Sequence, residues 1–180
     1  MEVWKAFEQN KITHSAAHHL MTIYDLLHRN GYARVTDVAK NLEITRGSAS
    51  ITLKALKEKG LVTEDENKFL RLSEEGQNIS HAIQSMRKIF KKFLVEVLQV
   101  DREQAEIDAC KIEHLLSRET GEKLLNFMKF LSSDDTDVQH FLQTYRHYES
   151  TCSGLPDECE VCDTECLMPD EESEQVSNRT

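Results

Sequence analysis

The sequence predicts a mainly α-helical fold, because apolar residues recur at helical spacing through most of the chain before residue 150 and alternate at one place only. Two prolines and six glycines are too few for the many tight turns of an all-β fold. The alternation spans 61–72, where a polar turn from Glu64 to Asn67 separates strand candidates at 61–63 and 69–72. We therefore expect helices, one two-stranded hairpin and further helices, in that order, before a final segment of different composition.

Capping residues and glycines mark the ends of the expected helices. The first helix, 15–29, carries apolar residues at i, i+3, i+4 and i+7, begins at Ser15 and ends before Gly31. Before it, Trp4 and Phe7 lie in a weakly amphipathic stretch and can pack on a neighbouring element. The other helices are expected after Arg34 with Thr36 as cap, from about Thr45 to Gly60, from Ser73 to about Leu98, and at 102–117, 119–132 and 134–149.

Two short helices, a turn and a hairpin form a winged helix-turn-helix, in which the second helix enters the major groove of DNA. The helix that begins near Thr45 has small, polar and basic residues on its outer face, which suit contacts to phosphates and base edges. A solvated face in another small α-helical domain is the alternative, and the hairpin and the local positive charge favour DNA. The expected DNA-binding residues are Thr45, Arg46, Gly47, Ser48, Ser50, Ile51 and Lys54.

Charge is distributed unevenly along the chain. The net charge is −10, but residues 151–180 contribute −8, whereas residues 28–92 carry +5. The acidic total therefore does not argue against a nucleic-acid partner. No run of 18 apolar residues predicts a transmembrane helix, and the charged N-terminal stretch lacks the apolar core of a signal peptide. We expect a cytoplasmic protein with no membrane partner.

Cys110, Glu113 and His114 form the most informative cluster of reactive side chains. Their spacing of i, i+3 and i+4 places a thiol, a carboxylate and an imidazole on one face of a helix. Such a face can supply three ligands to a divalent transition metal. A buried cysteine beside a surface Glu-His pair has the same spacing, so the residues alone leave both interpretations open.

Five short stretches then occur in a fixed order: Ile23-Tyr24, Gly31 to Val35, Asp37 to Ala39, Lys59 to Val62, and Asp108 to Ser117. With these stretches, residues 12–131 resemble the diphtheria toxin repressor and manganese transport regulator family of metal-dependent transcriptional regulators. The resemblance implies a winged domain, an all-helical dimerisation domain, a homodimer and a metal site at the C-x-x-E-H segment, Cys110 to His114.

The resemblance also implies a metal ligand on the first helix, at the position of His18. Relatives have Met or Asp there, and manganese-type relatives have carboxylates at the positions of Met21 and Cys110. His14 and Met21, about one turn away on either side of His18, are weaker candidates. Thiolate and imidazole are softer ligands than carboxylates, so we expect Fe(II) rather than Mn(II), with Zn(II) or Co(II) binding in vitro.

A second metal site of the family uses a histidine on the long helix after the wing. This chain has Met86 to Lys92 there, with arginine and lysines but no histidine. Arginine and lysine are not ordinary metal ligands at neutral pH. We therefore expect this site to be lost or rebuilt. Lys88, Lys91 and Lys92 either occupy its space electrostatically or form a solvated basic face, and we favour the solvated face.

The C-terminal segment, 151–180, is acidic and rich in cysteine, and it is too short for the SH3-like barrel of larger relatives. Four cysteines within fifteen residues of a cytosolic protein indicate ligands before disulfides. A [4Fe–4S] cluster, a Zn(II) site and an unmetallated segment all stay open, since the spacing matches neither a ferredoxin nor a zinc ribbon. The four residues are Cys152, Cys159, Cys162 and Cys166.

These observations predict a homodimeric, metal-dependent and iron-responsive DNA-binding repressor of metal-uptake genes, which binds double-stranded DNA at a near-palindromic operator. The alternative is a winged-helix regulator that senses redox state or an iron–sulfur cluster through its C-terminal cysteines. An enzyme is not expected, because Cys110 and His114 have no oxyanion donor or glycine-rich loop nearby in sequence. The expected divisions are 1–76 for DNA binding, 77–150 for dimerisation and metal sensing, and 151–180 as the tail.

Overall fold

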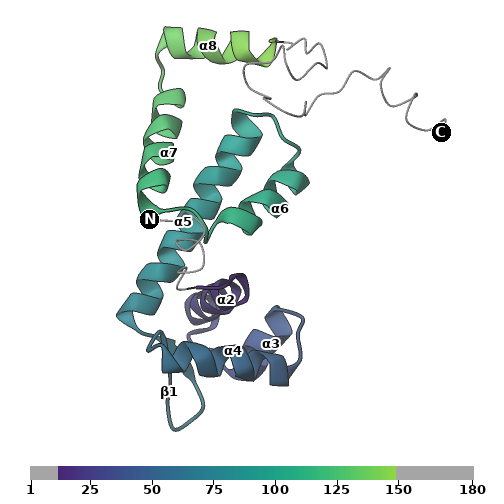
Figure 1. The fold of residues 1–180 in the computed structure, drawn as a ribbon, viewed down its shortest axis with the longest axis vertical. Coiled ribbons are helices and arrows are strands. Elements are labelled where there is room, and N and C mark those ends of the chain that lie inside the picture. Colours follow the sequence, from purple (N-terminus) through teal and green to yellow (C-terminus); the bar gives the residue numbers. More distant parts are fainter. Residues whose placement is uncertain (1–11, 149–180) are drawn as a thin grey trace, which may run out of the picture. The chain divides into compact units, whose positions relative to one another are not determined.

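The structure is a computed structural model, and it describes residues 12–148. The order of elements is three helices, a two-stranded hairpin and four further helices in this part of the chain (Figure 1). The elements are α2 (His14–Asn30), α3 (Val35–Asn41), α4 (Arg46–Glu58), β1 (Val62–Glu64), β2 (Leu70–Leu72), α5 (Glu74–Glu96), α6 (Arg102–Ile112), α7 (Arg118–Leu131) and α8 (Thr136–Arg146). The mainly helical fold and the winged helix-turn-helix are therefore confirmed.

Local capping explains where the first helices begin and end. Thr13, rather than Ser15, caps α2, because its side chain accepts a hydrogen bond from the N–H of Ala16. Gly31 follows α2 in the left-handed conformation, with φ +76°, and its N–H bonds to Leu27 O. The start of α4 is as predicted, since the Thr45 side chain accepts from the N–H of Ser48.

The wing is a short antiparallel pair. Val62 pairs with Leu72 and Glu64 with Leu70, one residue later than predicted for the first strand. In the turn, the Asp65 carboxylate accepts hydrogen bonds from the N–H groups of Asn67 and Phe69, both at 2.9 Å. The hairpin seals the core of the winged part, whose fully buried members include Leu20, Ile23, Val38, Leu53, Leu56, Val62 and Leu70.

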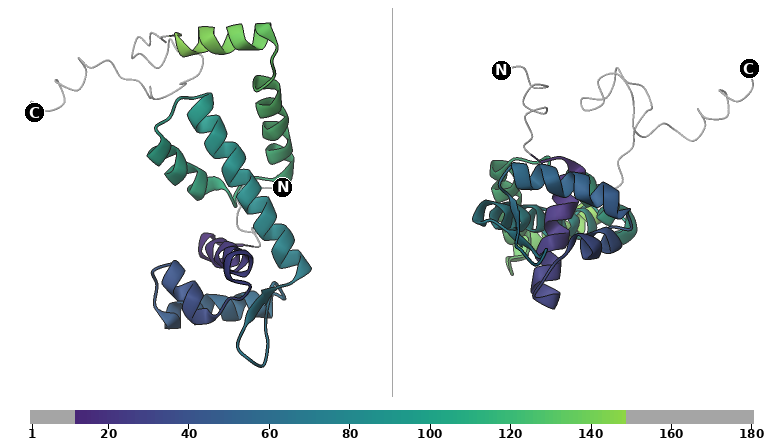
Figure 2. Two further views of the ribbon diagram at one scale, coloured as in Figure 1. Left: turned by 180° about the vertical axis from the view of Figure 1, so that it is seen from behind. Right: turned by 90° about the horizontal axis from the view of Figure 1, so that it is seen from below.

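The long helix α5 connects the wing to the helices that follow. Its cap is Ser73, whose side chain accepts from the N–H of Gly76. A Cβ at Gly76 would lie 2.3 Å from Leu61 O, so the close approach of α5 to the wing requires glycine there. Contacts join α5 to α2 and also to α6 and α7 (Figure 2). This packing brings the first helix of the winged part near α6.

One difference from the predicted helices concerns the C-terminal part. The helix expected at 102–117 ends at Ile112, and a turn separates it from α7. The contacts divide the chain into two units, Met1–Ser133 and Asp134–Thr180. In the second unit α8 is capped by Asp135 and buries Val138 and Leu142. Across the described residues, no helix combines the length and the apolar character needed to cross a membrane.

Candidate metal centre and nucleic-acid interface

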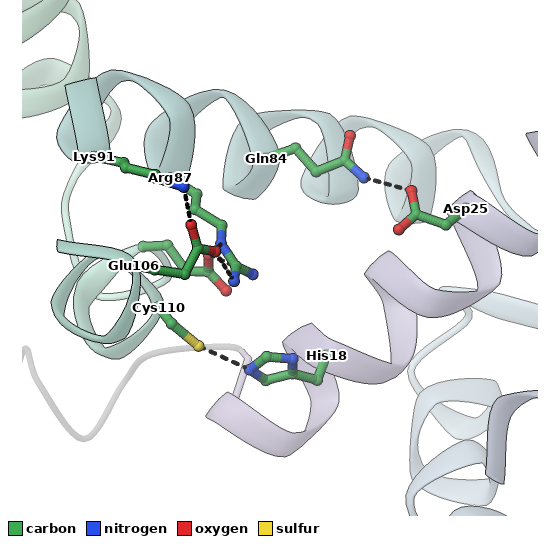
Figure 3. A network of polar contacts seen from close by, with 8 residues as sticks. His18, Asp25, Gln84, Arg87, Lys91, Glu106 and Cys110 are labelled. Atoms are coloured by element: carbon green, nitrogen blue, oxygen red, sulfur yellow. Dashed lines mark hydrogen bonds and ion pairs between the residues drawn. The ribbon is translucent and has the colours of Figure 1, made fainter. Parts of the chain in front are cut away.

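The candidate metal centre lies where α2 meets α6 (Figure 3). Nε2 of His18 is 3.3 Å from Sγ of Cys110, although 92 positions separate the two residues in sequence. His14 lies one helical turn before His18, and their ring centroids are 4.4 Å apart. One ligand atom from each of His14, His18 and Cys110 lies within 4.8 Å of the other two. We call these three residues the histidine–cysteine cluster.

Burial affects the protonation of His18 and Cys110 in this cluster. Burial is the main cause that lowers the pKa of His18, and the nearby His14 is the next. The neutral imidazole of His18 is therefore favoured. Burial also raises the pKa of the Cys110 thiol, and the Glu113 carboxylate adds to the effect. The neutral His18 imidazole and the Cys110 thiol are thus the favoured resting forms. An imidazole–thiolate set is suited to Fe(II), Co(II) or Zn(II), and the thiol releases a proton when it becomes a ligand.

Glu113 is the C-cap of α6, with helical backbone angles of φ −53° and ψ −30° and an N–H bond to Ala109 O, and His114 lies in the turn that follows. Glu113 is only 2% exposed, and its Oε2 lies 3.6 Å from Nη1 of Arg87. Neither carboxylate oxygen of Glu113 has a hydrogen-bond partner among the described residues, and burial raises the pKa of Glu113 to about 7. The ring of His114 lies 5.0 Å from that of His14. Its Nδ1 is buried and has no hydrogen-bond partner within the described region.

The expected metal ligands therefore do not all lie in the same place. The structure brings His18, Cys110 and the weaker candidate His14 together, and it places His114 beside His14. The Glu113 carboxylate lies beside Arg87. Met21, the other weak candidate, is buried and packs in an apolar cluster with Ala17 and Ile83.

The basic segment on α5 combines exposed lysines, Lys88 and Lys92, with an ion-pair network formed by Arg87 and Lys91. Nε of Arg87 donates to Oε1 of Glu106 at 2.9 Å, and Lys91 contacts the other oxygen of the same carboxylate (Figure 3). The hydrogen bonds from Lys91 and then Arg87 lower the pKa of Glu106. Arg87 thus links Glu106 to the buried Glu113. The expected solvated face was wrong for Lys91, since sequence spacing within α5 does not reveal an acidic partner on α6.

The candidate nucleic-acid interface is the outer face of α4. All seven residues expected to bind DNA are exposed, and Ile51 is 74% exposed. Ala49, Leu53 and Leu56 point inward and hold the helix on the core. The polar and basic residues therefore line the solvent side without disturbing the packing.

The structure adds residues that the sequence reading missed. A cavity of about 530 Å³ lies between α3, α4 and the hairpin, and Arg34, Arg46 and Lys68 are among its lining residues. The guanidinium of Arg34 lies over the Phe69 ring, 4.5 Å from its centroid. An arginine before a helix and a lysine in the wing were visible signals, but only the fold places them beside α4. The expected tail ligands Cys152, Cys159, Cys162 and Cys166 lie outside the described residues.

The fold and these two surfaces define a winged-helix protein joined to a helical part with a candidate transition-metal centre. Two family models match the chain. Residues 11–70 match the N-terminal DNA-binding domain of the iron-dependent repressors, and residues 73–140 match their metal-binding and dimerisation domain. The chain belongs to the iron-dependent repressor family.

Individual relatives agree with this assignment. An uncharacterised HTH-type transcriptional regulator of Methanocaldococcus jannaschii is 33% identical over 119 residues, which are 66% of this chain and 95% of that protein. The iron-dependent repressor IdeR of Mycobacterium tuberculosis is 24% identical over 119 residues, or 66% of this chain and 52% of that protein. The chain thus spans about half the length of such curated relatives. The structure of the manganese regulator SloR matches 64% of this chain and 54% of its own, with a TM-score of 0.58 and 22% identity, and this likeness supports the fold.

Proposed function

We propose that this chain is a homodimeric, metal-dependent transcriptional repressor that binds double-stranded DNA and controls metal-uptake genes. The observation that carries the proposal is the contact between His18 on α2 and Cys110 on α6. The first residue belongs to the part matched to DNA-binding domains and the second to the part matched to metal-binding and dimerisation domains. A metal ion held by both residues would therefore link DNA binding to metal supply.

The residues present fit a divalent transition metal. Imidazole and thiol donors converge in the histidine–cysteine cluster. Close by, Glu113 and His114 have buried polar atoms that find no hydrogen-bond partner among residues 12–148. His14, His18 and Cys110 would hold the ion, with His114 and Glu113 available to complete its coordination. When bound, the metal supplies cross-links between α2 and α6. The soft donor set favours Fe(II) over Mn(II).

In this proposal, regulation acts through the mobility of the winged domain relative to the helical domain. Without the cross-link, α2 and α6 each pack on α5, and Sγ of Cys110 approaches Nε2 of His18. With it, the two recognition helices of a dimer keep one separation, which suits two half-sites of a near-palindromic operator. Metal binding would then raise DNA affinity, because the metal-bound dimer would already have the spacing of the operator half-sites.

A dimer interface is consistent with exposed apolar residues in the helical part. Leu115, Phe127 and Phe130 are 39%, 42% and 57% exposed, and they lie on or just before α7. Large apolar side chains at the surface of a helical domain are typical of an interface between subunits. These residues belong to the segment matched to dimerisation domains.

The test compares four binding measurements on DNA duplexes that the Fe(II)-loaded protein selects from a random pool. Wild type and Cys110→Ala are each measured anaerobically with Fe(II) and with a chelator. We expect Fe(II) to strengthen binding by wild type and to have little effect on Cys110→Ala. Cys152→Ala, which removes a thiol outside the proposed centre, should respond like wild type. Equal binding in all conditions would exclude the metal-dependent function.

A further inference from the structure

A cavity of about 520 Å³ lies between α5 and the segment from Glu113 to Leu125. Its walls are mostly apolar, and its larger apolar lining residues are Ile79, Ile83, Met86, Ile89, Leu116 and Leu125. Sites of about 300–1,000 Å³ accommodate small organic molecules, so a few large side chains also fit in such a space. The DNA-facing helix and the histidine–cysteine cluster account for none of this apolar lining.

The described chain begins at the edge of this cavity. Ile12 lines it, and together with Ile79 it also lines a second, smaller cavity of about 300 Å³ beside Leu61. Ile12 is half-buried and packs against both apolar clusters of the winged part. An apolar surface therefore extends to both sides of the point where residues 1–11 join the fold.

Residues 1–11 contain the aromatic side chains that this surface lacks. Trp4 and Phe7 are spaced three residues apart, with charged residues around them. Phe7 is five residues from Ile12, so an extended chain of about 3.3–3.6 Å per residue allows it to reach at most about 18 Å from that anchor. A tether of this length also gives the segment a high effective concentration at the cavity, which a free ligand or a second copy lacks.

We propose that residues 1–11 dock on this apolar surface of their own chain, with Trp4 and Phe7 in the cavity between α5 and the Glu113–Leu125 segment. Burial of aromatic side chains is strongly favourable, and the cavity offers them apolar walls. Docking also sets the direction in which the chain enters α2, whose first residue is His14. The proposal stands independently of the metal-dependent function.

The single tryptophan of the chain makes the proposal directly testable, because all indole emission comes from Trp4. In the full-length, metal-free protein we expect blue-shifted emission and protection from acrylamide quenching. Ala82, an exposed residue on the cavity wall, offers a way to fill the space without removing any core side chain. Ala82→Phe should shift the emission to the red and increase quenching.

Gln77→Phe is the matched control, since Gln77 is exposed on α5 and does not line the cavity. It should leave the Trp4 emission unchanged. Solvent-exposed emission in wild type, or buried emission that Ala82→Phe does not alter, would overturn the proposal. Emission that becomes exposed on dilution would also overturn it, because it would assign the cavity to the segment of a second copy. Concentration-independent burial that only Ala82→Phe removes would support it.

Discussion

The buried carboxylate of Glu113 lies 3.6 Å from the guanidinium of Arg87, and Arg87 also binds Glu106. One arginine on α5 therefore balances two carboxylates, from α6 and from its C-terminal cap. Because α6 also carries Cys110, this ion-pair network holds the cysteine in position opposite His18.

Removal of the guanidinium should destabilise the protein markedly. Arg87→Met leaves Glu113 without a counter-charge, and breaking a buried pair in this way costs about 3–5 kcal/mol. We expect a smaller loss from this pair at pH 8, about 1.4 kcal/mol, because Glu113 has a pKa of about 7 and can take up a proton when the guanidinium is removed. Urea unfolding of the metal-free protein at pH 8 measures the effect. Arg87→Met combined with Glu113→Gln should recover part of the loss, and a double variant no more stable than Arg87→Met would contradict this explanation.

The stability of the metal-free protein should depend on pH through Glu113. Its pKa of about 7 in the folded state lies above the ordinary value of 4.5, so folding favours the protonated carboxyl. The contribution to stability is full below about pH 4.5 and is lost as pH rises to about 7, with a total of order 3 kcal/mol. Unfolding free energies of wild type and Glu113→Gln between pH 5 and 8 test this, and Glu113→Gln should be less sensitive to pH. The exposed Glu122→Gln should follow wild type.

Metal affinity should distinguish His14 from Met21. Loss of a second-shell partner commonly reduces metal affinity by about 10–100-fold, so loss of a direct ligand should cost more than about 100-fold. We expect this from His14→Ala, His18→Ala and Cys110→Ala, whereas Met21→Leu should preserve affinity because Met21 packs among apolar side chains. Co(II) titration in a full-length background with the four tail cysteines replaced by serine gives the affinities and the thiolate–Co(II) absorption. Weak binding by Met21→Leu with normal binding by His14→Ala would reverse the assignment.

DNA binding should depend on salt through the basic residues of α4. Each phosphate contact contributes about 0.9 to the slope of log K against log salt concentration for B-DNA. Arg46→Ala and Lys54→Ala should each weaken binding and reduce the magnitude of the slope by about 1 for each subunit in contact. Fluorescence anisotropy over a range of salt concentrations measures both quantities. Arg118→Ala removes a charge from α7, away from α4, and a comparable decrease in its slope would point to nonspecific electrostatics.

Deletion of residues 151–180 distinguishes a metal-dependent repressor from a regulator that senses redox state or a cluster through its C-terminal cysteines. If the metal centre between α2 and α6 is the sensor, the shortened chain should retain Fe(II)-dependent DNA binding. If the C-terminal cysteines read a redox or cluster signal, the deletion should abolish all regulation. Anaerobic DNA-binding measurements with Fe(II), with a chelator and after mild oxidation distinguish these results.

Much of the fold is predictable from the sequence because the signals that specify it act over a few residues. Thr45 and Ser73 cap their helices, and Gly31 adopts the left-handed conformation that ends α2. Periodicity likewise predicts which residues of α4 face the core and which face solvent. The cap of α2 was misplaced by two residues, since Thr13 and Ser15 are both competent caps and the sequence does not show which hydroxyl meets a free N–H.

Tertiary packing decided the arrangement of the candidate metal centre. The spacing of Cys110, Glu113 and His114 predicts one shared face, but it does not reveal that the buried Glu113 carboxylate, at the C-cap of α6, lies beside Arg87 on α5. The pairing of His18 with Cys110 followed from family resemblance, not from spacing, because residues 92 positions apart meet only when α5 holds α6 against α2. Local patterns determine the helices, whereas long-range contacts among buried charges and apolar faces determine which side chains converge.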